Sequence, residues 1–296
     1  MVTAPPRSVP APLLVLGAVV SVQFGGALAA TLVPQIGAAG SVLLRLGFAT
    51  ALLLAWARPR WRGHSRQAWL TVAAFGLAMG GMNYAFYGSL AHLPIGVAVT
   101  IEFVGPLTLA AVLSRRPRDL MAVGAAAVGV LLISRAFSVP LSQLETTGIL
   151  LALIAGACWA AYIIFSARTG TAFPALEGLA LAMVVATAAI LPFGLWDVAR
   201  HGAESWSPVV VLTGLGVAVL SSVLPYSLEL LALRRLSAKV FGILLSLEPA
   251  VAALAGLLVL GQRLSPVQLA GMVLVVLASA MVLGLGARSG PRRRRD

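Results

Sequence analysis

Long apolar segments separated by short polar connections occupy almost the whole chain. A helix needs roughly 20 apolar residues to cross a bilayer, and most of these segments reach that length. The pattern predicts ten membrane-spanning helices: Ala11–Val33, Gly37–Ala57, Gln67–Leu90, Pro94–Leu113, Leu120–Ser134, Thr147–Ala167, Ala175–Trp196, Pro208–Leu233, Ala238–Leu260 and Val267–Gly286. We expect the short fifth helix to extend back into Arg118 and Asp119. No connection has room for a soluble domain, so the helices are expected to form one bundle.

The first apolar segment has an alternative interpretation as a cleaved signal peptide. Ala27-Leu28-Ala29 resembles a cleavage motif, but the segment is longer than a typical signal h-region. The polar leader before it, residues 1–10, carries only one charge, Arg7. We therefore expect this segment to remain as the first span.

The composition supports a multi-pass membrane protein. Of the 296 residues, 60% are hydrophobic and 10% are charged, whereas a soluble domain is about half apolar and a quarter charged. A single cysteine, Cys158, rules out a disulfide framework and a thiolate metal cluster. The three histidines are far apart in sequence and form no visible ligand cluster. The chain also lacks a G-x-x-x-x-G-K-[ST] loop, so we expect neither ATP binding, nor a metal, nor another cofactor.

The basic residues are distributed unequally between the two sides of the predicted bundle. If the amino terminus is cytoplasmic, 17 of the 21 lysines and arginines lie on the cytoplasmic side, three lie on the far side, and Arg45 lies within a helix. This asymmetry follows the positive-inside rule and predicts that both termini are cytoplasmic. The net charge of +12 therefore reflects topology, and we expect no nucleic-acid partner.

An internal repeat relates the two parts of the chain. With a shift of 143 residues, Leu93-Pro94-Ile95-Gly96-Val97 aligns with Leu236-Ser237-Ala238-Lys239-Val240, Pro106 with Pro249, and Asn83 with Tyr226. Since each part has five spans, an odd number, the second must be inverted relative to the first. The sequence thus predicts an all-α polytopic membrane protein with ten transmembrane helices as two inverted five-helix repeats. Such repeats are typical of secondary transporters, although channels also have them.

The expected domain boundaries follow from the repeat. They are a cytoplasmic leader (1–10), a first repeat (11–140), a second repeat (141–287) and a basic cytoplasmic tail (288–296).

Two carboxylates lie deep in apolar helices, each close to a proline. Glu102 precedes Gly105-Pro106, and Glu248 directly precedes Pro249. At 1.5 Å per residue they lie about 12 and 15 Å into their segments, near the middle of a hydrocarbon core of roughly 30 Å. Desolvation favours a protonated carboxyl group there, so either residue is a candidate proton carrier. The alternative is a structural acid that binds the backbone opened by the proline.

The repeat does not superpose these two acids. Glu102 aligns with Leu245, whereas Glu248 aligns with Gly105. We therefore expect the symmetry to be broken where the chemistry takes place.

Arg45 is the only basic residue far from a helix end. It needs a counter-charge, for which Glu102 or Glu248 is the expected candidate, and it is either part of a structural salt bridge or a ligand for a substrate carboxylate. Glu229 lies nearer the cytoplasmic end, close to Arg234 and Arg235. We expect its side chain to extend towards the membrane surface, in a structural role.

Other polar and aromatic side chains lie at matching places in the two parts. Asn83 and Tyr87 share a helix face, with Tyr84 adjacent, and Tyr226 is their counterpart in the repeat. We expect these residues to line a cavity rather than to form an interfacial tyrosine belt. The first span of each part adds further polar groups, for which hydrogen bonding between helices is the alternative role. These groups are Gln23, Trp159 and Tyr162.

Several motifs, in order along nearly the whole chain, resemble the drug/metabolite transporter superfamily of EamA type. They are SVQFGGALA (21–29), LLRLGFATALLL (43–54), GGMNYAFY (80–87), IEFVGPL (101–107), SRRP (114–117), GACWAAYI (156–163), LPYSLE (224–229) and FGILLSLEPA (241–250). Within the superfamily, the likeness is greatest to bacterial exporters of threonine and homoserine. The resemblance implies a ten-helix, proton-driven exporter in the inner membrane, with a central cavity and both termini cytoplasmic.

The resemblance also implies a set of functional positions. They are Gln23, Arg45, Asn83, Tyr84, Tyr87, Glu102, Trp159, Tyr162, Tyr226, Glu229 and Glu248. We expect an exporter of small amino acids, with protons as the coupled ion and the lipid bilayer as its environment. A broad-specificity drug or metabolite exporter is the alternative within the same fold. A membrane enzyme would need an acidic or histidine cluster at one interface, which the sequence lacks. The sequence leaves the oligomeric state open.

Overall fold

The computed structural model describes residues 9–134, 140, 144–202, 206–260 and 264–287, and every regular element in these ranges is a helix. In chain order the elements are α1 (Ala11–Ile36), α2 (Ala38–Ala57), α3 (Arg66–Ser89), α4 (Ile95–Val112), α5 (Pro117–Ser134), α6 (Thr146–Ala172), α7 (Glu177–His201), α8 (Pro208–Ala218), η4 (Val219–Val223), α9 (Leu224–Leu233), α10 (Ala238–Leu245), α11 (Leu247–Leu260) and α12 (Pro266–Ala287). The basic tail and residues 1–8 of the leader lie outside the described residues.

Seven helices within the described ranges are long and apolar enough to span a membrane, with α8, η4 and α9 counted as one. The chain is therefore an all-helical, multi-pass membrane protein. The more specific count of ten spans stays a prediction.

Most helix bounds agree with the apolar segments to within a few residues. The fifth helix does extend back, beginning at Pro117 with Asp119 in its first turn. Two of the expected continuous spans are instead interrupted. The segment 208–233 contains a π-helical turn at Val219–Val223, and the segment 238–260 breaks at Ser246.

Proline explains the first interruption. Pro225 cannot donate a backbone hydrogen bond, and its ring collides with the carbonyl one turn earlier, at Ser221. The preceding turn widens accordingly, so that the Leu224 N–H bonds to Val219 O, five residues back. The second interruption lies just before the Glu248-Pro249 pair, so Glu248 occupies the first turn of α11.

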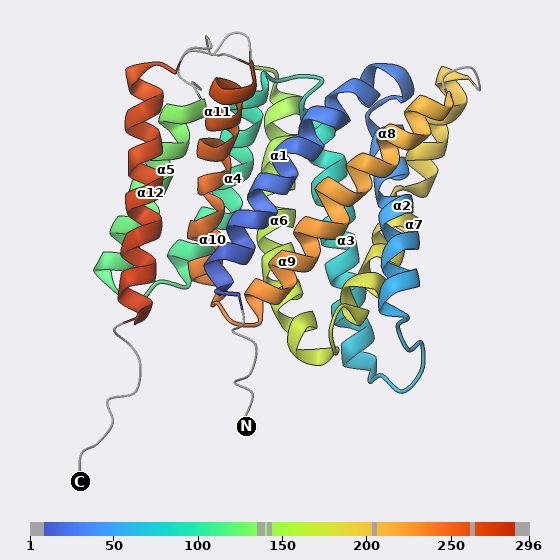
Figure 1. Ribbon diagram of the computed structural model, residues 1–296, viewed down its shortest axis with the longest axis horizontal. Helices are drawn as coiled ribbons and strands as arrows, with labels where there is room; N and C mark the ends of the chain where they lie inside the picture. Colours follow the sequence, from blue (N-terminus) through green and yellow to red (C-terminus); the bar gives the residue numbers. More distant parts are fainter. Residues whose placement is uncertain (1–8, 135–139, 141–143, 203–205, 261–263, 288–296) are drawn as a thin grey trace, which may run out of the picture.

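The helices form a single bundle, with α1 beginning and α12 ending at the same edge (Figure 1). Close packing joins α3 to α6, α5 to α12, α2 to α7, and α4 to α6. Helix α1 crosses the segment formed by α8, η4 and α9, and it also contacts α11. Elements of the first and second parts of the chain are thus interleaved.

Polar links join these parts at both ends of the bundle. At the edge where α12 ends, Lys239 Nζ of α10 lies 2.7 Å from Asp119 Oδ2 of α5. At the opposite edge, Asp197 Oδ2 of α7 accepts hydrogen bonds from the N–H groups of Ala39 (2.8 Å) and Gly40 (3.3 Å), in the first turn of α2. A carboxylate is stabilising at a helix N-terminus, so Asp197 fixes the start of the helix that carries Arg45.

Candidate functional site

Arg45 is the centre of a buried polar cluster assembled from α2, α3, η4 and α9. Its side chain is 6% exposed. The guanidinium donates from Nε to Ser222 Oγ (2.9 Å), and from Nη2 to Asn83 Oδ1 and to the Tyr226 hydroxyl (3.0 Å). Tyr87 also lies within interaction distance of the guanidinium. Helices α2 and α3 and the continuous η4–α9 segment, which is far from them in sequence, therefore meet at one cation.

Asn83 and Tyr226, which the repeat aligns, are in direct contact. Asn83 Nδ2 donates to the Tyr226 hydroxyl (3.1 Å) and to Met79 O of its own helix (2.8 Å). These bonds fix the orientation of the amide, so that its oxygen faces Arg45.

The expected ion pair between Arg45 and Glu102 or Glu248 is wrong. Within the described ranges, no carboxylate lies within salt-bridge distance of Arg45. Its partners are all uncharged, because α2 faces α3 and η4 here, whereas the two acids lie on α4 and α11. The positive charge of Arg45 is therefore buried and hydrogen-bonded, but these partners do not neutralise it.

Glu229 is buried, contrary to the expectation that its side chain would extend to the membrane surface. Its side chain is 7% exposed, and Glu229 Oε2 accepts a hydrogen bond of 2.6 Å from the Tyr162 hydroxyl. The Tyr162 ring packs against Tyr226, with centroids 5.6 Å apart. Because Tyr226 also binds Arg45, this ring contact joins the Glu229–Tyr162 pair to the Arg45 cluster.

Glu102 and Glu248 lie on the side of the site formed by α4 and α11. Glu102 is 7% exposed, and Glu248 is half-buried. The two carboxylates interact electrostatically with each other, and Glu248 also interacts with Glu229. In the parts of the chain that the structure describes, neither Glu102 nor Glu248 has a salt bridge. The site thus combines an arginine region with a separate carboxylate region.

A close helix crossing positions Glu102. A Cβ built at Gly105 would lie only 1.8 Å from Gly156 O, and one at Gly156 would lie 2.6 Å from Glu102 O. Since neither position has space for a side chain, the backbones of α4 and α6 are in direct contact. Glu102 lies one turn before Gly105, at this contact. The glycine pair therefore fixes the distance between the backbone of Glu102 and α6.

Of the remaining predicted residues, Trp159 and Gln23 are at least partly buried, whereas Tyr84 faces outward. Trp159 is buried, and its ring packs edge-on against Phe103, with centroids 4.8 Å apart. Gln23 is half-buried on α1. Tyr84 does not join the site, because it is 38% exposed and packs against Phe193 with a centroid distance of 4.7 Å. Adjacent residues on a helix point about 100° apart, which explains why Asn83 faces inward while Tyr84 faces outward.

Ser222, which binds Arg45 Nε, is not among the residues that the sequence predicted for the site. Its place in the site depends on the π-helical turn, which shifts the facing of the residues after Ala218 relative to a regular α-helix. In the sequence, Pro225 within an apolar segment was the one sign that this helix is irregular. Residues of the type that bind metal ions form no group of three or more in the described ranges.

A helical bundle with several candidate membrane spans, a buried cation and buried carboxylates is typical of multi-pass membrane transporters. The sequence profile of the EamA-like transporter family matches residues 146–284. The threonine/homoserine exporter RhtA of Escherichia coli is 41% identical over 273 residues, covering 90% of this chain and 89% of the relative. The protein of the same name from Salmonella typhimurium has the same identity and coverage.

The chain therefore belongs to the EamA-like transporter family, and it is a transporter rather than an enzyme. A solved crystal structure with 17% sequence identity matches 94% of this chain and 99% of its own chain, with a TM-score of 0.75. At that identity the match demonstrates a shared fold.

Proposed function

We propose that this protein exports small neutral amino acids of the threonine and homoserine type. The observation that carries the proposal is Arg45, a buried cation that binds Ser222, Asn83 and Tyr226 and has no carboxylate partner among the described residues. An unneutralised charge is costly inside a bundle, and a guanidinium pairs well with a carboxylate. The α-carboxylate of an amino acid supplies the missing charge. The names of the relatives support the same substrate class.

Protons are the coupled ion in this proposal. Glu102 is its main carrier and Glu248 its second, because both lie in the bundle without a cation partner among the described residues. A carboxyl group in apolar surroundings binds a proton more readily than one in water. Glu229, held by Tyr162, connects this region with the arginine cluster. Tyr87, Trp159 and Gln23 complete the wall around the neutral part of the substrate.

In this proposal, the transporter has ten spans in two inverted repeats, residues 11–140 and 141–287. Exchanging the repeats maps α1 onto α6, α2 onto α7, α3 onto α8–α9, α4 onto α10–α11 and α5 onto α12. The packing follows this exchange, since α3 on α6 corresponds to α1 on α8–α9, and α4 on α6 to α1 on α11. Gly129 and Gly271 support a two-fold axis, because a Cβ at each would meet the carbonyl of the other, at 2.8 and 2.7 Å.

Transport then follows from rocking of the two repeats about the central site. The links Asp119–Lys239 and Asp197–α2 lie at opposite ends of the bundle, and each joins one repeat to the other. Opening one end while the other stays closed exposes the site to one side at a time. The protein lies in the bacterial inner membrane with both termini cytoplasmic, as the distribution of basic residues favours.

The proposal is tested with the purified chain in proteoliposomes loaded with labelled threonine or homoserine. An acidic external medium should accelerate release, and a protonophore should remove the acceleration. If neither amino acid is released under a pH gradient, the proposed substrate class is wrong. Competition by lipophilic cations would instead favour a broad-specificity drug or metabolite exporter, for which the aromatic wall of Trp159, Tyr162 and Tyr226 is suited.

A further inference from the structure

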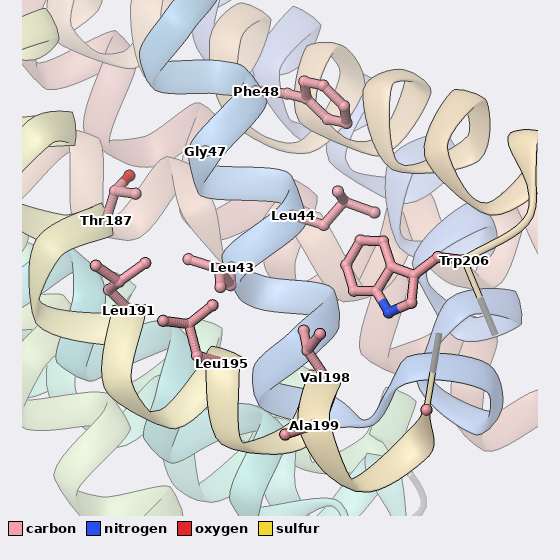
Figure 2. Close-up of a pocket in the computed structure, with 11 residues that line it drawn as sticks. Leu43, Leu44, Gly47, Phe48, Thr187, Leu191, Leu195, Val198, Ala199 and Trp206 are labelled. Carbon is pink, nitrogen blue, oxygen red and sulfur yellow. The ribbon is translucent and has the colours of Figure 1, made fainter. Parts of the chain in front are cut away.

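A cavity separate from the polar site lies between α2 and α7 and is bordered at one end by Trp206. Its volume is about 790 Å³. The wall is aliphatic on both sides, with Leu43 and Leu44 from α2 and Leu191 and Leu195 from α7 (Figure 2). Leu191 and Leu195 are 44% and 52% exposed, so the cavity opens on the outer, apolar surface of the bundle. In a membrane, this opening faces lipid.

The length of the cavity matches one leaflet of a bilayer. Its wall extends along α7 from Thr187 to Gly202, just beyond the end of the helix, a distance of about 22 Å at 1.5 Å per residue. Half of a bilayer, including its headgroup region, is about 20–22 Å thick. At the inner end, the Thr187 hydroxyl lies 2.7 Å from that of Thr50, next to Gly47 on α2. The cavity thus reaches from the end of a span towards the level of Arg45.

The indole N–H of Trp206 is an unpaired hydrogen-bond donor at the outer end of the cavity. Trp206 Nε1 is buried and has no hydrogen-bond partner among the described residues. Figure 2 shows the indole ring beside the aliphatic wall, with its nitrogen on the edge that faces Val198. An indole N–H is a donor only, and tryptophan is typical of the membrane–water boundary. Arg200, exposed in the last turn of α7, adds a positive charge at this end of the helix.

We propose that this cavity is a binding site for a glycerophospholipid, with one acyl chain between α2 and α7. An ester carbonyl of the lipid accepts the hydrogen bond of Trp206 Nε1, and Arg200 attracts the phosphate. The aliphatic wall and its length match an acyl chain. The unpaired N–H of Trp206 matches an ester carbonyl, and the charge of Arg200 matches the phosphate. A polar amino acid would leave its own groups unpaired along the aliphatic wall, so this site is separate from the transport site.

Gly47 permits a direct test, because a Cβ there meets no atom within 4 Å. Gly47→Phe should fill the inner end of the cavity without disturbing the packing. Gly124 provides the control, since it is exposed on α5 and also has open space around its Cβ. Gly124→Phe adds the same side chain to a surface outside the cavity.

The measurement is native mass spectrometry of the full chain after exchange into detergent, with phosphatidylglycerol titrated back. Wild type and Gly124→Phe should retain one lipid per chain, and Gly47→Phe should lose it. Trp206→Phe keeps an aromatic ring but removes the indole N–H donor, so retention should weaken about fivefold. Equal retention in wild type and Gly47→Phe would overturn the proposal, as would retention of a free fatty acid or another small apolar molecule in place of the phospholipid.

A second readout does not depend on detergent. Phosphatidylglycerol with brominated acyl chains should quench tryptophan fluorescence in vesicles at low mole fractions, with saturation, and Gly47→Phe should abolish this saturable component. Quenching that rises only in proportion to the brominated lipid would indicate general lipid contact and would contradict a defined site. Both readouts are independent of transport activity, so they remain informative if the proposed substrate is wrong.

Discussion

Arg45 has three uncharged partners and no carboxylate among the described residues. A purely structural arginine inside a bundle would be expected to have a counter-ion. Its absence from the immediate surroundings leaves the guanidinium available to an anionic group of the substrate. This geometry favours a ligand role over a structural salt bridge, the two roles that the sequence left open.

Replacement of Arg45 tests this role. Arg45→Gln keeps hydrogen-bonding capacity but removes the charge, and it should reduce threonine flux about 10- to 100-fold, the range for loss of a charge-assisted bond. Arg45→Lys keeps the charge but loses the planar fork, so a smaller reduction is expected. Arg168→Gln, at an exposed position of α6, is the matched control and should transport normally. Unchanged flux in Arg45→Gln would refute direct binding.

Glu102 should couple the proton gradient to transport. Glu102→Gln removes the titratable group at nearly constant volume, so release should no longer respond to pH, while exchange of threonine down its own gradient should continue. Glu145→Gln is a suitable control, because the Glu145 side chain is 64% exposed. Retained pH dependence in Glu102→Gln would transfer the proton role to Glu248, and the same assay on Glu248→Gln would then decide.

At the scale of elements, backbone contact between α4 and α6 determines the position of Glu102. Gly105→Ala would place a Cβ 1.8 Å from Gly156 O, and the helices must separate to relieve this clash. We expect a loss of about 1–3 kcal/mol in stability, the usual cost of overpacking, and a lower melting temperature in detergent.

Gly124→Ala is the corresponding control for this crossing. It meets no atom within 4 Å, and replacing a helical glycine with alanine is intrinsically favourable by up to about 1 kcal/mol. Its melting temperature should therefore equal or exceed that of wild type. A similar response of both variants would show that the α4–α6 contact is not close in solution.

The sequence predicted the elements better than it predicted how they face one another. Apolar length alone located the helices, and the alignment of Asn83 with Tyr226 anticipated two residues that are hydrogen-bonded. The facing of Tyr84 and the depth of Glu229 depend on helix rotation and tilt, which apolar length does not specify. Ser222 lies within the π-helical turn near Pro225, and there it bonds to Arg45. This partner of Arg45 was therefore beyond prediction from a regular helix.

At the scale of the whole molecule, the orientation in the membrane can be tested by labelling. Single cysteines at Arg116 and Gly202, in a Cys158→Ala background, lie on the connections at opposite ends of the bundle. With both termini cytoplasmic, an impermeant thiol reagent outside intact cells should reach position 202, and position 116 should react only after permeabilisation. Reaction of both from outside would contradict the proposed topology.

We propose that the positive charge of Arg45 recognises the carboxylate of an amino acid during export. The most direct measurement is competition in wild-type proteoliposomes between labelled threonine and either unlabelled threonine or threonine amide, which lacks the carboxylate. We predict that threonine inhibits labelled flux and that the amide, at the same concentration, does not. Equal inhibition by the two compounds would refute this role of Arg45, because it would show that the carboxylate contributes nothing to recognition.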